Sequence, residues 1–245
     1  MNISLKNAIG DLFKTEKGWM TLLLMTVCQL IPIVGPIVVL GYMIRRFASV
    51  RSGLGEPDFQ FDFFGEYLQI GLWPFLASLV VGLVAIPLVL IGYSPLLIIA
   101  IDPNSKGLVT FAIVLTILLF AVMILLLMML SFPVILRSGL MMDFKAGFSK
   151  TFIVDFSKKV GVSLVLWIWL LTLISIIPIY LGVFALVVGF YFVATIAGFA
   201  QFHLVFQHYD LYLERGGEKI AINPEVLKSS STAPPLPRTG HQEQG

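Results

Sequence analysis

Charged residues are scarce in this sequence, and four long stretches contain none. They make up 12% of the 245 residues, whereas about 25% is usual for a soluble domain. Asp, Glu, Lys and Arg are absent from residues 19–44, 70–101, 108–136 and 160–209, and 58% of the chain is hydrophobic. Uncharged runs of this length exclude a soluble globular protein, a disordered chain and a nucleic-acid binder. They predict helices that cross a membrane.

The residue patterns of catalytic and metal sites are also missing. Cys28 is the single cysteine, so no internal disulfide can form, and there is no phosphate-binding loop, nucleophile elbow or HExxH motif. His203 and His208 are five residues apart, so they lie on different faces of a helix and do not form a zinc pair. We therefore expect no enzyme, no catalytic residues, no metal and no cofactor. Because no predicted span carries an ionisable Asp, Glu, Lys or Arg, an ion-coupled pump is not expected either.

The uncharged runs provide length for about five or six membrane helices, since one crossing takes about 20 residues. The run 160–209 is too long for one crossing. We predict two helices there, over about 160–177 and 183–208, joined by a tight turn at 178–182, where Pro and Gly occur.

The other runs differ in continuity. Residues 70–101 are expected to kink or break between Gly92 and Pro95, and residues 108–136 to form one continuous span. The run 19–44 is interrupted by Pro32, Gly35 and Pro36. It is either one kinked crossing or a hairpin whose second arm continues to about Ser52.

The distribution of Lys and Arg predicts the orientation. Basic residues are concentrated in 45–69, 137–159 and the tail after 209, which we therefore place on the cytoplasmic side, with 102–107 outside. Lysines near the N-terminus also favour the cytoplasmic side, and only a hairpin in the first run satisfies this preference. The hairpin is therefore the preferred interpretation.

A shift of 51 positions aligns Asp11–Phe13 with Asp62–Phe64, and Pro36–Tyr42 with Pro87–Tyr93. The alignment predicts an internal repeat whose membrane helix ends in a Pro-to-Gly-Tyr element, and chance similarity between apolar stretches is the alternative. The positions at which we expect a helix break or a cavity are Pro32, Gly35, Pro36, Gly41, Pro87, Gly92, Pro178 and Gly182.

Aromatic residues mark the charged segments between the uncharged runs. Residues 1–18 and 137–159 have apolar positions at helical spacing, which predicts helices lying in the membrane interface. In 56–67, aromatic and acidic residues alternate, and the acidic side can face the basic 137–159 segment. The expected interfacial collar consists of Phe61, Phe63, Phe144, Phe148, Phe152 and Phe156.

The lipid bilayer is the first expected partner. The basic 137–159 segment either anchors the chain through aromatic and lysine side chains or docks anionic lipid or a protein partner at the cytoplasmic face. Small residues at Ala185, Gly189, Ala194 and Gly198 predict close helix packing, within the chain or between two copies, which leaves the oligomeric state open.

The predicted fold is an all-α polytopic transmembrane bundle with amphipathic interfacial helices. Residues 1–18 form an interfacial helix and 19–209 the transmembrane domain. Residues 210–245 form a cytoplasmic tail, which we expect to be disordered from about residue 229, where Ser, Pro and Gln are frequent.

Several of these elements together resemble a known family. They are Trp19, the Ile31–Gly35 break, Gly41-Tyr42 followed by Arg45 and Arg46, and the Phe61–Gly65 segment that leads to Gly71-Leu72. This combination resembles the prokaryotic membrane family catalogued as domain of unknown function four thousand and thirteen, over roughly residues 10–210. The family's usual Leu-Pro before the acidic-aromatic loop is replaced here by Gly55-Glu56-Pro57. The resemblance implies the cytoplasmic membrane of a bacterium or archaeon and supplies no catalytic residues.

Two functional hypotheses follow. The first is a non-enzymatic membrane scaffold or accessory subunit, whose aromatic cytoplasmic segments organise lipid or a partner. The second is a transporter or channel for a small apolar or neutral solute, with the Pro and Gly breaks lining its path.

Overall fold

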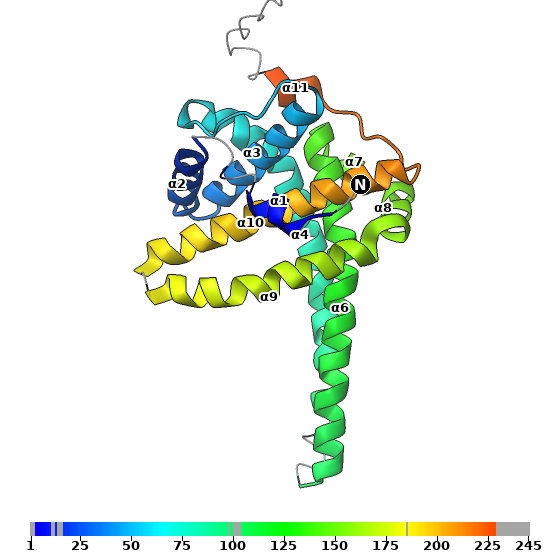
Figure 1. Ribbon diagram of the computed structural model, residues 1–245. Helices are drawn as coiled ribbons and strands as arrows, with labels where there is room; N and C mark the ends of the chain where they lie inside the picture. The colour runs from blue at the N-terminus through cyan, green and yellow to red at the C-terminus, as the bar shows by residue number, and fades with distance from the viewer. Residues whose placement is uncertain are drawn as a thin grey trace, which may run out of the picture.

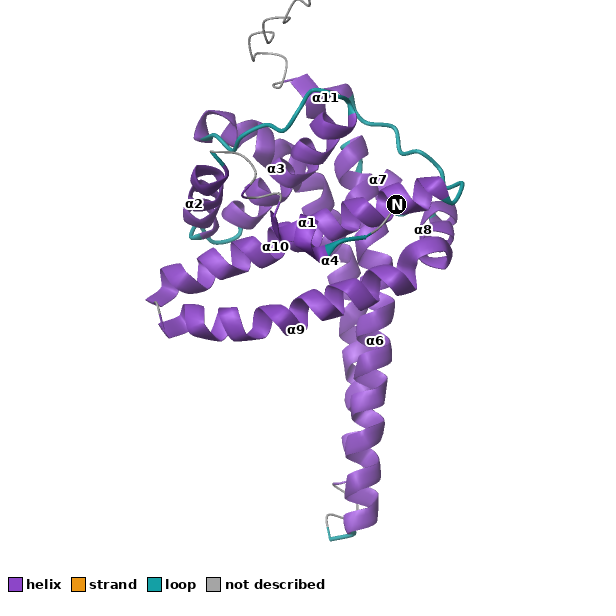
Figure 2. Cartoon of the chain, viewed as in Figure 1, coloured by secondary structure: helices purple, strands orange, loops and turns teal. Residues whose placement is uncertain are grey.

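The chain folds entirely into helices and connecting loops in the part that the computed structural model describes, which is residues 3–10, 13, 17–97, 99, 104–184 and 186–228. Figure 2 shows helices and loops and no strand in these residues. The prediction of an all-α helical bundle is therefore confirmed. Residues 229–245, expected to be disordered, lie outside the described part.

The helices, in chain order, are α1 (Leu5–Gly10), α2 (Gly18–Gln29), α3 (Val34–Arg51), α4 (Phe64–Tyr93), α6 (Lys106–Met141), α7 (Phe144–Gly147), α8 (Lys150–Phe156), α9 (Val162–Phe184), α10 (Leu186–Glu214) and α11 (Pro224–Leu227). Two 3-10 turns, η2 (Phe61–Phe63) and η3 (Ser94–Leu96), flank α4, and a π-helical turn, η4 (Ser157–Gly161), joins α8 to α9.

Two long hairpins project from a compact group of helices (Figure 1). One hairpin is made by α4 and α6, and the other by α9 and α10. They leave in clearly different directions. The group from which they project, called the head below, comprises α1, α2, α3, α7, α8 and α11 together with the adjoining ends of the four long helices.

Four helical segments are long and apolar enough to cross a membrane: Phe61–Leu96, Lys106–Met141, Lys150–Phe184 and Val188–Glu214. Outside the head their side chains are apolar and exposed, as at Leu90, Ile117, Ile177 and Phe184. Surface of this kind is stable only in an apolar medium, so the protein is embedded in a membrane.

The first uncharged run explains why four segments qualify where five or six were expected. It forms a hairpin, the preferred interpretation, because α2 and α3 are separate helices joined by a turn in which Ile33 takes a φ of 64°. A positive φ is rare for a β-branched residue and marks a sharp change of chain direction. α2 has only 12 residues, and α3 carries Arg45, Arg46 and Arg51, so neither qualifies as a span.

The continuity of the other runs matches the sequence in part. Residues 108–136 lie in the single helix α6, and α4 ends at Tyr93, inside the expected break. Residues 160–209 form two helices, but the predicted turn position is wrong, because Pro178 lies inside α9, which continues to Phe184. Pro87 likewise lies inside α4. A proline inside a helix removes only its own backbone hydrogen bond, whereas a turn leaves several N–H and C=O groups without partners. In an apolar medium, where water cannot replace these partners, a continuous helix through the proline is therefore favoured over a turn.

The internal repeat is not confirmed. Pro36 lies in the first turn of α3 and Tyr42 is buried in the head. Pro87, its counterpart, lies late in α4, and Tyr93 ends that helix with an exposed ring. The two aligned segments therefore occupy different structural positions.

Three glycines bring the first helices into backbone contact. A Cβ atom added to Gly41 would lie 1.8 Å from the Tyr67 carbonyl oxygen, and one added to Gly71 would lie 1.9 Å from the Ile37 carbonyl oxygen. A Cβ atom added to Gly35 would likewise lie 2.0 Å from the Cys28 carbonyl oxygen. Since no side chain fits at these distances, glycine is required where α3 crosses α4 and where it leaves α2. Gly41, predicted as a helix break, is instead the centre of this crossing.

The described ends of the chain pack onto the head. Ala8 of α1 is fully buried, in a cluster with Leu171 of α9 and Leu204 of α10. After α10, the backbone N–H of Asn223 donates to the Leu140 carbonyl at 2.8 Å. Val226 of α11 is fully buried in the main core. Residues 215–228 are therefore a folded part of the head.

The α3–α4 crossing predicts a large difference between two alanine substitutions on one helix. Gly71→Ala should destabilise the protein by about 1–3 kcal/mol or more, because the new methyl group collides with the backbone of α3. Gly82→Ala is the control, since a Cβ there meets nothing within 4 Å and alanine favours the helix. Thermal unfolding of the purified variants in detergent measures both. Equal stability of the two variants would contradict the crossing.

Candidate functional site

A pocket of about 270 Å³ lies between α3 and α10 and brings charged and aromatic side chains together. It is lined by Met43, Arg46, Phe47, Val50, Arg51, Glu56, Phe199, His203, Phe206, Gln207 and Asp210. This set combines two basic and two acidic side chains with three phenylalanines. It is called the α3–α10 pocket below.

Helical periodicity explains why these residues share a pocket. Met43, Phe47 and Val50 of α3 are spaced by four and three residues, which places them on one face of the helix. Phe199, His203, Phe206 and Asp210 repeat the same spacing on α10 and form the facing wall.

Both arginines of the pocket are paired with carboxylates. Arg46 Nη2 donates to Glu56 Oε2 at 2.5 Å, and its guanidinium carbon lies 4.5 Å from the centre of the Phe199 ring. Arg51 Nη1 donates to Asp210 Oδ1, so this ion pair ties α3 to α10. The charges are therefore balanced within the pocket.

The aromatic and amide groups complete the wall. The rings of Phe47 and Phe206 stack with centroids 4.0 Å apart. Gln207 Nε2 lies 2.8 Å from His203 Nδ1 and also donates to the Ser4 carbonyl oxygen at 3.2 Å. The Ser4 N–H donates to Gln207 Oε1 at 2.9 Å. The segment before α1 is thus fixed to the pocket wall.

A second charged cluster lies beside the pocket, around Arg45. Its side chain is buried and donates to Glu66 Oε2 at 3.0 Å, while its guanidinium carbon lies 5.0 Å from the Phe63 ring and 5.3 Å from the Tyr67 ring. Tyr42 packs edge-on against Tyr67. This cluster fixes the start of α4 against α3.

The acidic segment 56–67 does not face the basic 137–159 segment, so that expectation is wrong. Glu56 and Glu66 pair with arginines of α3, and Asp58 pairs with Lys17 at 3.5 Å. The segment follows α3 directly and folds back along it. The hydroxyl of Tyr42 donates to the Pro57 carbonyl oxygen at 3.0 Å, and burial raises the pKa of this phenol.

The predicted aromatic collar is divided between core and surface. Phe152 and Phe156 are buried in the main core with Tyr212, so their placement at the membrane interface is wrong. Phe144 and Phe148 are half-buried against α4 and α6, Phe63 is half-buried, and Phe61 is exposed. A four-residue repeat of phenylalanine does not distinguish a face turned to lipid from one turned to the core.

The small-residue motif of α10 is only partly a packing motif. Gly189 lies against Gly182 of α9, where an added Cβ would be 2.8 Å from the Gly189 carbonyl oxygen. Ala194 is half-buried, an added Cβ at Gly198 meets nothing within 4 Å, and Ala185 lies outside the described residues. Gly182 is therefore a contact between the two arms of the α9–α10 hairpin.

The remaining break residues lie at three places. Pro32 lies in the turn between α2 and α3, and Gly92, near the end of α4, approaches the Phe120 ring. Pro36 lines a second cavity, of about 230 Å³, in which Gln29 and Thr195 are the polar side chains among Val39, Leu40, Met43, Ile135, Gly198, Phe199 and Phe202.

Histidine and carboxylate residues do not gather into a metal site in the described part of the chain, where no group of three or more His, Cys, Asp or Glu could hold an ion. His208 is fully buried, with Nδ1 2.7 Å from the Leu204 carbonyl oxygen and Nε2 3.2 Å from Ser163 Oγ. His203 faces the α3–α10 pocket instead.

Sequence reasoning missed the α3–α10 pocket. His203 and His208 lie on different faces of the helix, whereas Gln207 and Asp210 follow His203 at four and seven residues and share its side. The signal was a polar and aromatic stripe at helical spacing. Its partner, the arginine stripe of α3, lies more than 140 residues earlier, so the sequence alone does not join them.

The Arg45 cluster predicts a stability effect at Glu66. Glu66→Gln leaves the buried guanidinium without its carboxylate, and we expect a loss of about 1–3 kcal/mol. The loss is smaller than for a fully buried pair, because the Glu66 side chain is 51% exposed. Asp62→Asn, an exposed change in the same segment, is the control. Thermal unfolding with unchanged midpoints for both variants would contradict this role.

No curated protein and no solved structure matches the chain. The family model described as a protein of unknown function (DUF4013) matches residues 24–200. The match includes the three contact glycines, all three arginines of α3 and, of the α10 side of the pocket, Phe199. Because the match covers well over half of the chain, this protein belongs to the DUF4013 family.

Proposed function

We propose that this protein is a non-enzymatic scaffold or accessory subunit of the cytoplasmic membrane. The observation that carries the proposal is the separation of two surfaces. Apolar side chains cover the hairpins outside the head, and the ion pairs are concentrated in the head. Such a molecule is held by lipid on one part and offers a polar surface on the other.

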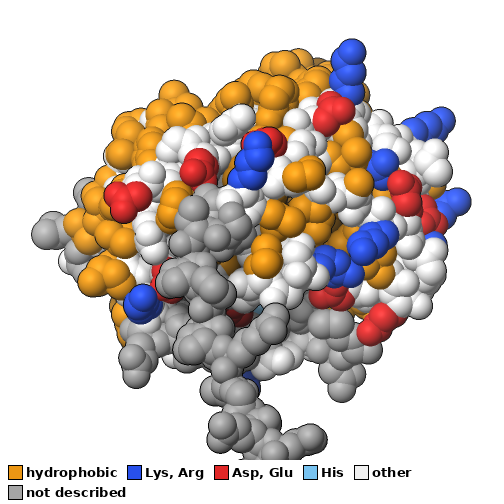
Figure 3. Space-filling view, turned by 90° about the horizontal axis from the view of Figure 1, so that it is seen from above, with side chains coloured by type: hydrophobic (Ala, Val, Ile, Leu, Met, Phe, Trp, Pro, Cys, Tyr) orange, Lys and Arg blue, Asp and Glu red, His pale blue; other side chains and the backbone are white. Residues whose placement is uncertain are grey.

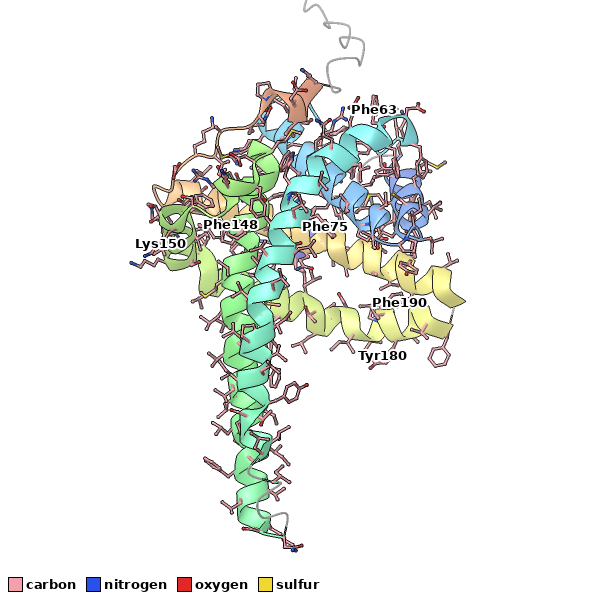
Figure 4. All side chains as sticks on the ribbon, turned by 180° about the vertical axis from the view of Figure 1, so that it is seen from behind. Phe63, Phe75, Phe148, Lys150, Tyr180 and Phe190 are labelled. Atoms are coloured by element: carbon pink, nitrogen blue, oxygen red, sulfur yellow. The ribbon has the colours of Figure 1, made fainter. Side chains whose placement is uncertain are left out.

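The head supplies the polar surface. Seen from above, it carries acidic and basic side chains interspersed over one face (Figure 3). Lys145, Lys150 and Lys158 are exposed on α7, α8 and η4, and Lys150 points outward from the side of the head opposite the α9–α10 tip (Figure 4). Exposed lysines next to membrane helices favour the cytoplasmic side and support docking of anionic lipid or a protein partner there.

The charged groups of the described residues favour a structural role over a catalytic one. The acidic residues around the α3–α10 pocket pair with arginines, and the buried histidine bonds to a backbone carbonyl and a serine. An enzyme would need a base or nucleophile aimed at a substrate position. The ion pairs serve instead to hold α3, α4 and α10 together.

The two hairpins differ at their tips. The α4–α6 tip carries polar residues, Asn104, Ser105 and Lys106, as expected where a hairpin reaches water. The α9–α10 tip, residues 176–190, is apolar apart from the hydroxyl of Tyr180. It also runs in a different direction from α4–α6 (Figure 1). We propose that α4–α6 crosses the bilayer and that α9–α10 ends within it, as a wedge beside the head.

Cysteine labelling tests this arrangement. In a Cys28→Ala background, Asn104→Cys should react with an impermeant maleimide on intact cells, and Lys150→Cys only after lysis. Tyr180→Cys should react in neither case, because its side chain lies in lipid, but should react after denaturation. Labelling of Tyr180→Cys on intact cells would show that α9–α10 crosses. Labelling of Lys150→Cys there would reverse the orientation.

A transporter or channel is the second candidate, and the cavity at Pro36 is the observation that favours it. The cavity lies where a break was expected, but its lining is mostly apolar, with Gln29 and Thr195 as exceptions. Such a lining suits an apolar or neutral solute only.

Solute entry separates the two candidates. If the protein is a scaffold, liposomes containing it should admit glycerol no faster than empty liposomes, as measured by light scattering. Faster entry that is abolished by Gly198→Leu, which fills the cavity, would replace the scaffold proposal. Gly82→Leu, on the exposed side of α4, is the matched control.

A further inference from the structure

We propose that the α3–α10 pocket binds the zwitterionic head group of a phospholipid, a group that carries a phosphate and an ammonium together. The inference deepens the proposed function and rests on it, because it assumes that the head lies at the membrane surface. Four observations carry it: the position of the pocket, its charges, its apolar wall and its size.

The pocket lies where two apolar runs meet their first charges. The uncharged run 19–44 ends at Arg45, and the run 160–209 ends at Asp210. The fold brings these two ends together, since Arg46 and Arg51 of α3 and Asp210 of α10 line the same pocket. In a bilayer, the change from apolar to charged residues along a helix coincides with the lipid head groups.

The charges of the pocket match a group that carries both signs. A phosphate alone would be attracted by the arginines but repelled by the carboxylates of Glu56 and Asp210. An ammonium alone would be attracted by the carboxylates but repelled by the arginines. A guanidinium has five N–H donors and a carboxylate about four acceptor positions, more than one mutual contact uses. A phosphate can therefore bind the arginines while the ammonium binds the carboxylates.

The charged groups are within reach of a ligand. The side chains of the Arg51–Asp210 pair are 26% and 33% exposed, and Glu56 is 38% exposed. Arg51 and Asp210 are half-buried, so their interactions with a ligand are less screened than those of a fully exposed pair.

The apolar wall and the volume suit a head group that leaves its acyl chains in the bilayer. Val50 is 48% exposed at the pocket, next to the stacked rings of Phe47 and Phe206. The volume of about 270 Å³ is just below the range of about 300–1,000 Å³ usual for sites that enclose a drug-sized molecule. The pocket therefore holds a head group and its glycerol but not the chains.

Lipid binding to the full-length protein tests the inference. The protein is stripped of lipid in detergent and mixed with phosphatidylethanolamine, phosphatidylglycerol or inorganic phosphate, and bound species are measured by native mass spectrometry. We expect phosphatidylethanolamine to bind at least tenfold more tightly than phosphatidylglycerol, and no retention of inorganic phosphate. Equal binding of the two lipids, or retention of phosphate, would overturn the zwitterion assignment.

Two variants distinguish the pocket from the lipid-covered hairpins. Val50→Trp fills the pocket entrance and should weaken phosphatidylethanolamine binding at least tenfold, whereas Lys106→Gln, an exposed change at the far tip of the α4–α6 hairpin, should leave it unchanged. Glu56→Gln removes a carboxylate partner of the ammonium, so binding should shift towards phosphatidylglycerol. Unchanged binding in Val50→Trp, or an unchanged lipid preference in Glu56→Gln, would overturn the proposal. Thermal unfolding of each variant confirms that it is folded.

The outcome is separable from the proposed function. If cysteine labelling places the head at the cytoplasmic face and the lipid preference is absent, only the head-group inference fails. If the labelling places Lys150 on the outer side or within lipid, the proposed function fails whatever the pocket binds.

Discussion

The backbone contact between α3 and α4 at Gly41 and Gly71 is the constraint on which the head depends. It lets the two helices approach until each glycine meets a carbonyl of the other helix. This approach puts Arg45 beside the Phe63 and Tyr67 rings and within reach of Glu66. In lipid, where burial of apolar surface between helices gains little, close backbone packing is a main source of helix association. The contact therefore holds α3 and α4 together through backbone atoms alone, and the side chains around Arg45 add to it.

Three arginines on two turns of α3 then connect the head in three directions. Arg45 pairs with Glu66 of α4, Arg46 pairs with Glu56 in the loop between α3 and α4, and Arg51 pairs with Asp210 of α10. Each is partly or fully withdrawn from water and has a carboxylate and at least one aromatic ring as neighbours. The arrangement neutralises a cluster of positive charge that would otherwise repel itself at the base of the membrane helices.

Features that depend on neighbouring residues, such as where helices begin and end, could be predicted from the sequence. Features that depend on contacts between distant residues, such as which helix face is buried, could not. The single helix over 108–136, the division of 160–209 and the hairpin at Pro32 follow from local composition. The sequence predicts a turn at Pro178 because proline ends helices in water, but an apolar medium preserves the helix around it. The spacing of Phe152 and Phe156 predicts a place at the membrane interface, because it shows that one face is apolar but not which residues cover that face. Tyr212, on α10, covers it. The α3–α10 pocket depends on the same kind of distant pairing.

The position of the pocket and the apolar tip of α9–α10 are related through one helix. α10 begins at the tip, with no charge in its apolar part, and reaches Asp210 only after it has passed Phe199, His203 and Phe206. This helix therefore joins the apolar tip to the pocket wall, and the Arg51–Asp210 ion pair ties its charged end to α3. A ligand in the pocket would contact α10, which forms one arm of the hairpin, and α3, which the glycine crossing holds against α4. α10 is continuous from Leu186 to Glu214, so one helix forms both an arm of the hairpin and a wall of the pocket.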